Sequence, residues 1–179
     1  EFRRVLFRSQ FLKLLSRFEL SVEQAQSLYE EGARRNAGWG GTDKEILENP
    51  YRIYELSRLD PDGIRLLTVD RGVFPDDAVR LVHPLEAPSC LESGVDRRRV
   101  RAFCLAALEK AALDGHTLQS RDGLVEAIRA FAVKPECAVT GDMLRAQLPM
   151  MAPEIVPVPL DDDQGLQLDR YKVIGELVR

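Results

Sequence analysis

The sequence predicts a mainly α-helical protein that ends in a short β-hairpin. Three observations support this fold class. Apolar residues recur every three or four positions in several stretches, the longest between residues 95 and 117, and this spacing puts them on one side of a helix. A serine, threonine or aspartate precedes these stretches, as N-cap residues do. Residues 155–160 and 166–168, near the C-terminal end, have the extended character of paired strands, and residues 64–69 fit either a strand or one helical turn.

Composition excludes several classes of function. The 179 residues are 45% hydrophobic and 30% charged, which is ordinary for a folded domain. The net charge of -4 gives no general attraction to nucleic acid or to an anionic membrane, so any contact with a polyanion requires a local cluster of cations. No apolar run approaches the roughly 20 residues of a membrane span, so no membrane contact is expected. The three cysteines are widely spaced, which favours reduced thiols in a cytoplasmic protein.

The two ends of the chain are interpreted separately. Residues 1–9, EFRRVLFRS, read like a translated sequencing adapter, and we expect them to be non-native and to lie outside the fold. The native sequence would then begin near Gln10. Residues 171–179 carry apolar residues at helical spacing and stop abruptly, which indicates the start of a truncated helix leading into a further domain.

Residues 10–60 predict a helix-hairpin-helix-like unit. Ser21 opens a capping-box sequence, and the helix that follows continues to the arginine pair before a glycine-rich turn. A second helix begins at Thr42 or Asp43. It has to stop just before Pro50, because the residue ahead of a proline disfavours helical geometry.

The glycine-rich turn 36–42 is a candidate phosphate site. Backbone N–H groups at such a turn and at the start of the next helix can face a phosphate. The cations Arg34, Arg35 and Lys44 flank the turn. The alternative is a tight surface connection over which Trp39 packs. The turn is not a nucleotide-binding P-loop, because it lacks the Gly-Lys-Ser/Thr sequence.

Residues 61–94 are rich in proline and glycine and predict an irregular connector. Pro61-Asp62-Gly63 is a strong turn signal within it. His83 lies in this segment and His116 lies further along the chain. Neither has cysteine or carboxylate neighbours at the spacing of metal ligands, so we expect no metal site.

The long helix after the connector carries the densest basic cluster. Asp96 is its expected N-cap and Gly115 its expected C-terminal stop. Cations at the start of a helix gain nothing from the helix dipole, so another role has to explain them. They are candidate DNA-backbone contacts, and the alternatives are ion pairs with Glu92, Asp96 and their neighbours, or packing on another domain. The cluster consists of Arg97, Arg98, Arg99 and Arg101.

Residues 95–170 together predict a winged-helix-like unit. A second helix begins after Thr117 or Ser120 and a third after Thr140. The two predicted strands follow, joined by a turn in which Asp161, Asp162 and Asp163 are followed by Gln164-Gly165. These three aspartates lack the later glycine and glutamate of a calcium-binding loop, so we interpret them as a solvated hairpin tip.

Three stretches, in this order, resemble the N-terminal helix-hairpin-helix-containing region of the stand-alone RecD-like ATP-dependent DNA helicases. They are LSVEQAQSLYEEG followed by ENPYRIYEL, then RRRVRAFCLAALEKAALDGHT, then SRDGLVEAI, and they span about residues 20–128. Two departures stand out. The first hairpin has an apparent insertion, NAGWGGTD, and the segment LDPDGIRLLTVDRGVFPDDAV lacks the glycine pair of the family's second hairpin.

The resemblance implies a DNA-binding accessory region of a helicase that unwinds DNA in repair. It would contact the backbone of single-stranded or forked DNA through the seven cations named above. The motor domain would lie beyond Arg179 and be this region's own partner, binding ATP and Mg²⁺. The fragment itself would carry no cofactor and, without a Walker motif, no activity. The alternative function is a helical protein-interaction module with no DNA contact. A small independent enzyme is not favoured, because no catalytic pair is visible.

Overall fold

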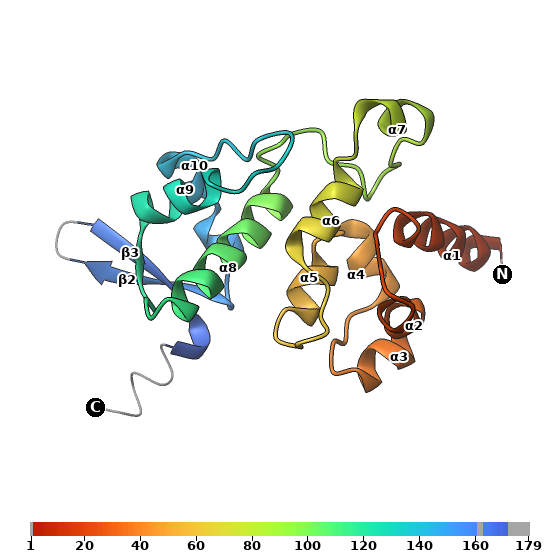
Figure 1. Ribbon diagram of the computed structural model, residues 1–179, viewed down its shortest axis with the longest axis horizontal. Coiled ribbons are helices and arrows are strands. Elements are labelled where there is room, and N and C mark those ends of the chain that lie inside the picture. Colours follow the sequence, from red (N-terminus) through yellow and green to blue (C-terminus); the bar gives the residue numbers. More distant parts are fainter. Residues whose placement is uncertain (1, 161–162, 172–179) are drawn as a thin grey trace. The chain divides into compact units, whose positions relative to one another are not determined.

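The structure, a computed structural model, describes residues 2–160 and 163–171. The chain divides into two units, residues 1–93 and 94–179. Among the described residues, the first unit is helical, and the second combines helices with a three-stranded antiparallel sheet (Figure 1). The predicted mainly helical fold class is confirmed at this level.

The first unit is built from short helices around an apolar core. Its helices are α1 (Phe2–Leu15), α2 (Val22–Tyr29), α3 (Glu31–Asn36), α4 (Asp43–Glu48), α5 (Arg52–Ser57), α6 (Leu66–Val73) and α7 (Asp77–Val82). The core side chains come from every helix except α3 and α7 and include Phe11, Leu14, Leu28, Ile46, Leu47, Tyr51, Ile53 and Val69. In α7, by contrast, no residue is buried.

Local capping signals place the helix boundaries of this unit. Ser21 accepts a hydrogen bond from the Gln24 N–H, and the Gln24 side chain accepts one from the Ser21 N–H, which completes the predicted capping box. Thr42 makes a second capping box with Glu45 at the start of α4. The helix ends at Glu48, with Asn49 extended ahead of Pro50, as predicted.

The predicted continuous helix from Ser21 to the arginine pair is wrong. The chain is extended at Glu30, with φ -128° and ψ 146°, and this residue separates α2 from α3. Because the helix ends here, the last carbonyl groups of α2 are available to accept hydrogen bonds from side chains. Arg34 donates to the Leu28 carbonyl and Arg8 to the Tyr29 carbonyl.

Two segments expected to lie outside regular structure are helical. Residues 2–9 form part of α1, and Arg8 donates to Asp43 of α4 at 3.0 Å. The expected irregular connector 61–94 contains α6 and α7. Burial explains α6: its Leu66, Val69 and Val73 side chains pack into the core, and this tertiary contact outweighs the proline and glycine content around the helix.

The second unit begins with the long helix. Its elements are α8 (Arg97–Leu113), β1 (Gln119–Ser120), α9 (Arg121–Arg129), α10 (Gly141–Gln147), the 3₁₀ helix η1 (Leu148–Met150), β2 (Ile155–Leu160) and β3 (Asp163–Leu168). The sheet order is β1-β3-β2 and both pairings are antiparallel. Gln119 lies opposite Leu166, and Ile155 lies opposite Leu168. In Figure 1, α8 runs beside this sheet.

Helix α8 supplies much of this unit's core. The predicted apolar face is confirmed over its first three turns, where Val100, Phe103, Cys104, Ala107 and Leu108 are buried. The predicted limits hold as well: the Asp96 side chain accepts from the Arg98 N–H, and Gly115 has a positive φ of 89°. Ser120 caps α9 and Thr140 caps α10.

Some predictions fall on residues that the structure does not describe. The predicted turn at residues 161–165 lies partly outside the described residues, and its last part is wrong, because Gln164 and Gly165 belong to β3 and lie opposite Pro159 and Val158. The truncated helix expected over residues 171–179 lies largely outside the described residues. Both predicted strands are present as β2 and β3, and β3 begins earlier than expected, at Asp163. No helix within residues 2–160 and 163–171 has the length and apolar character needed to cross a membrane.

Candidate nucleic-acid interface

The loop between α3 and α4 requires its glycines. Gly38, Gly40 and Gly41 have φ values of 77°, 67° and 75°, a left-handed region that residues with a side chain rarely adopt. A Cβ atom on Gly41 would also lie 2.5 Å from a methyl carbon of Leu56. Trp39 is buried, and its indole N–H donates to Asp60 at 2.8 Å. The loop is therefore fixed in one compact conformation.

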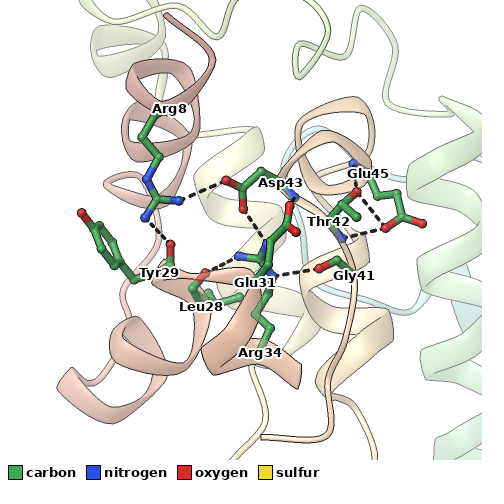
Figure 2. A network of polar contacts seen from close by, with 9 residues as sticks. All are labelled: Arg8, Leu28, Tyr29, Glu31, Arg34, Gly41, Thr42, Asp43 and Glu45. Carbon is green, nitrogen blue, oxygen red and sulfur yellow. Dashed lines mark hydrogen bonds and ion pairs between the residues drawn. The ribbon is translucent and has the colours of Figure 1, made fainter. Parts of the chain in front are cut away.

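Arg34 is a structural residue of this hairpin. Its side chain is fully buried, and the guanidinium donates to the Gly41 carbonyl at 3.1 Å, to the Leu28 carbonyl and to the Asp43 carboxylate at 2.5 Å (Figure 2). It also lies 5.2 Å from the centroid of the Phe11 ring. A phosphate cannot reach this group from solvent. The buried side chain is therefore not available for the predicted contact with DNA.

The backbone donors at the start of α4 are largely occupied by carboxylates of the chain itself. The Thr42 N–H donates to Glu45 at 2.7 Å, and the Asp43 N–H donates to Glu31 at 3.1 Å (Figure 2). The hydrogen bonds from Thr42 lower the pKa of the Glu45 carboxyl, which keeps it ionised. These are donors that a phosphate would need, so an incoming phosphate has to compete with two fixed negative charges.

Two predicted cations at the hairpin remain accessible. Arg35 and Lys44 are both exposed. Lys44 lies 3.7 Å from Glu48, but both side chains are more than half exposed, and a surface pair of this kind holds neither group firmly. The N–H groups of Gly41 and Lys44 have no acceptor among the described residues. The groups of this hairpin that a phosphate can reach are thus the side chains of Arg35 and Lys44 and these two backbone N–H groups.

Arg99 ties the basic start of α8 to the rest of the second unit. Its side chain is fully buried, donates to the Gly94 carbonyl at 2.9 Å and to the Pro135 carbonyl at 2.7 Å, and lies 5.1 Å from the centroid of the Phe103 ring. Like Arg34, Arg99 is therefore not available for the predicted DNA contact, because its guanidinium is enclosed and donates to backbone carbonyls.

The other arginines of this cluster differ in how firmly they are held. Arg98 pairs with Asp96 at 2.9 Å, as the ion-pair alternative expected. Burial alone would raise the pKa of Asp96, but the hydrogen bonds from Arg98 lower it overall. Arg101 pairs with Glu154 at 2.6 Å and donates to the Met150 carbonyl at 3.0 Å, which attaches α8 to the segment before β2.

Arg97 is the one arginine of the cluster whose side chain is exposed. Its one described polar contact is 3.8 Å to the sulfur of Met150, a weak interaction. Of the seven predicted cations, the structure thus leaves Arg35 and Lys44 accessible beside one hairpin and Arg97 accessible on the other unit.

Sequence reasoning missed one exposed cation on α10. Arg145 is 60% exposed, and it pairs with the carboxylate of Asp142, which lies 3.7 Å away and is itself 92% exposed. The segment TGDMLRAQL could have indicated this exposure. Its threonine caps a short helix in which Leu144 is the buried residue. A buried Leu144 directs the next side chain, Arg145, away from the core.

Two further observations concern the side chains that bind metal ions. Across residues 2–160 and 163–171, no group of three or more histidine, cysteine, aspartate or glutamate side chains is placed to hold a metal ion. His83 and His116 are both exposed.

Comparison of the chain with protein-family models, with curated proteins and with solved structures gives no match.

Proposed function

We propose that this chain is a DNA-binding accessory region of a RecD-like ATP-dependent DNA helicase. The observation that carries the proposal is the order of elements in the second unit. Helix α8, strand β1, helices α9 and α10 and strands β2 and β3 follow one another, and β1 pairs with β3 in a sheet of order β1-β3-β2. This order resembles that of winged-helix domains, many of which bind nucleic acid, and it supports the proposal of a winged-helix-like unit that was expected from the sequence.

The first unit supports the same proposal through its hairpin. Helices α3 and α4 are joined by a glycine loop with three positive φ values, as in a helix-hairpin-helix element. The stretches that resemble the helicase family include α2 and α5, which lie on either side of this hairpin in the chain. The carboxylates at the start of α4 weaken the backbone contact typical of such hairpins. Binding here therefore rests on Arg35 and Lys44.

The proposed contacts are electrostatic and independent of base sequence. Arg35, Lys44, Arg97 and Arg145 are exposed cations that reach the backbone of single-stranded or forked DNA. In helix-turn-helix proteins the second helix of the motif approaches the DNA, and α10 occupies that position after α9. The net charge of -4 confines binding to these local groups. ATP and Mg²⁺ belong to a motor domain outside this chain, which is its proposed partner in a cytoplasmic repair protein.

A helical protein-interaction module is the second candidate function. The internal pairing of the α8 arginines favours it: Arg98, Arg99 and Arg101 hold the second unit together and are not presented to a polyanion. In that case the accessible cations would be ordinary solvated side chains.

Fluorescence anisotropy with labelled DNA separates the two functions. We expect the chain to bind a single-stranded and a forked oligonucleotide at roughly 50 mM salt and to lose most of that affinity at roughly 200 mM. The double variant Arg35→Ala/Lys44→Ala should bind about tenfold more weakly at the lower salt concentration, because two phosphate contacts are lost. The matched control is Arg71→Ala/Arg80→Ala, which removes two exposed arginines of the same unit. Absence of binding by the unmodified chain at low salt would reject the DNA function.

A further inference from the structure

A groove in the first unit lies apart from the residues proposed to contact DNA. It runs between α1, α7 and the loop 83–89 and encloses about 550 Å³, within the range of ligand sites. We call it the α1–α7 groove. Its apolar walls are formed by Leu14, Leu47, Pro75, Val79, Val82 and Leu85. None of Arg35, Lys44, Arg97 and Arg145 lines it.

The walls of the groove are anchored to the core. Arg17 donates through Nε to the Gly72 carbonyl at 2.8 Å and through Nη1 to the His83 carbonyl, which joins the end of α1 to α6 and to the end of α7. At the other end of the loop, the buried Ser89 hydroxyl donates to the Leu47 carbonyl at 2.8 Å. The loop 83–89 is thus fixed at both ends, and the groove is formed before anything occupies it.

Helix α7 carries apolar side chains that the described residues of the first unit leave exposed. Val79, Leu81 and Val82 are 46%, 82% and 70% exposed. Three large apolar side chains exposed on one short helix indicate an interaction surface. Val79 and Val82 line the α1–α7 groove, whereas Leu81 does not.

The positive charge of the groove favours an occupant that carries negative charge. Lys13 and Arg17 both line it, and neither has a carboxylate partner among the described residues. Most other cations of this unit do have one, such as Arg71 with Glu19 and Arg80 with Asp77. Burial lowers the pKa of Arg17, but an arginine remains charged at neutral pH. The single carboxylate at the groove, on Glu86, leaves an excess of positive charge there.

We propose that the α1–α7 groove binds a short peptide segment of a partner protein in which apolar side chains are flanked by carboxylates. The apolar side chains enter between Val79 and Val82 on one wall and Leu14 and Leu85 on the other, while the carboxylates meet Lys13 and Arg17. In this way of binding, the apolar side chains of the peptide are buried in the groove and its negative charges match the positive charges of the groove. A nucleic-acid strand fits less well, because no phenylalanine, tyrosine or tryptophan lines the groove to stack on a base.

Selection from a phage-displayed library of random peptides, with the full chain immobilised, tests this proposal. Enriched peptides should combine leucine, isoleucine or phenylalanine with aspartate or glutamate. The strongest one, synthesised with a fluorescein label, should bind about tenfold more weakly to Val82→Glu and to Lys13→Glu. The matched controls are Leu81→Glu, on the same helix but outside the groove, and Lys44→Glu, at the hairpin. Both should bind the peptide as the unmodified chain does.

Four outcomes would overturn the proposal. One is the absence of enrichment over the empty support, and another is enrichment of basic peptides. The third is equal loss of peptide affinity in Val82→Glu and Leu81→Glu. Competition by a single-stranded oligothymidine that displaces the labelled peptide would instead assign the groove to DNA. Circular dichroism of each variant establishes that the fold is retained, as expected for side chains exposed to this degree.

Discussion

The buried position of Arg34 predicts that this arginine stabilises the fold and does not act on DNA directly. Arg34→Ala removes the donor to two backbone carbonyls and one of the two cations that face Asp43, while Arg8 keeps its 3.0 Å contact with that carboxylate. Removing one partner of a buried ion pair costs about 3–5 kcal/mol, and a buried carbonyl left without a donor costs about 1–3 kcal/mol. Because water and Arg8 compensate in part, we expect a loss of about 3–5 kcal/mol in the free energy of unfolding.

Urea denaturation followed by tryptophan fluorescence measures this loss. Trp39 is the only tryptophan, and its buried indole lies in the first unit, so the signal reports on that unit. With an m-value of about 1.5 kcal/mol per molar urea, the midpoint should fall by about 2–3 M. Arg35→Ala, one residue further along α3 and exposed, is the matched control and should change stability by less than about 0.5 kcal/mol. Equal effects of the two substitutions would refute the structural role of Arg34.

Three further predictions concern the second unit. Arg99→Ala should lower its stability by about 3 kcal/mol, whereas Arg97→Ala should be nearly neutral; thermal unfolding by circular dichroism compares them, and equal midpoints would contradict the assignment. Pro157 and Pro159 lie on β2, an edge strand, and lack the N–H that a further strand would need. Replacing both with valine should cause association that grows with protein concentration in analytical ultracentrifugation, and a variant that stays monomeric would speak against this role. The folded-state pKa of Asp96 is lowered from 3.8, so its contribution to stability is complete above about pH 5 and is lost as the pH falls through the folded value. Asp96→Asn should therefore flatten the dependence of the melting temperature on pH below about pH 4. An unchanged dependence would contradict a stabilising role of the Asp96 carboxylate at the start of α8.

The sequence was most informative where a structural feature depends on neighbouring residues. The caps at Ser21, Asp96 and Thr140 were predicted correctly because a cap hydrogen bond joins residues two or three positions apart. The apolar face of α8 was predictable for the same reason. Strand β1 was not predicted, since two residues carry no periodic signal and only the pairing with β3 defines them.

The roles of the arginines could not be predicted from neighbouring residues. Arg34 and Arg35 are adjacent in sequence, yet one is enclosed and the other exposed, because Arg34 meets partners contributed by α2, α4 and the glycine loop. Arg99 likewise meets the Pro135 carbonyl, which is 36 positions away in the chain. A cluster of cations in a sequence therefore predicts a basic surface only after their partners are known.

The salt dependence of DNA affinity tests the proposed function most directly. Anisotropy titrations of a labelled single-stranded oligonucleotide over a series of salt concentrations give the slope of log K against log salt. Four phosphate contacts, at Arg35, Lys44, Arg97 and Arg145, predict a slope of about -3, since each contact on a single strand contributes about -0.7. Replacing Arg97 with alanine should reduce the slope by about 0.7. Absence of binding at low salt, or a slope that removal of these cations leaves unchanged, would contradict the assignment of DNA binding to this chain.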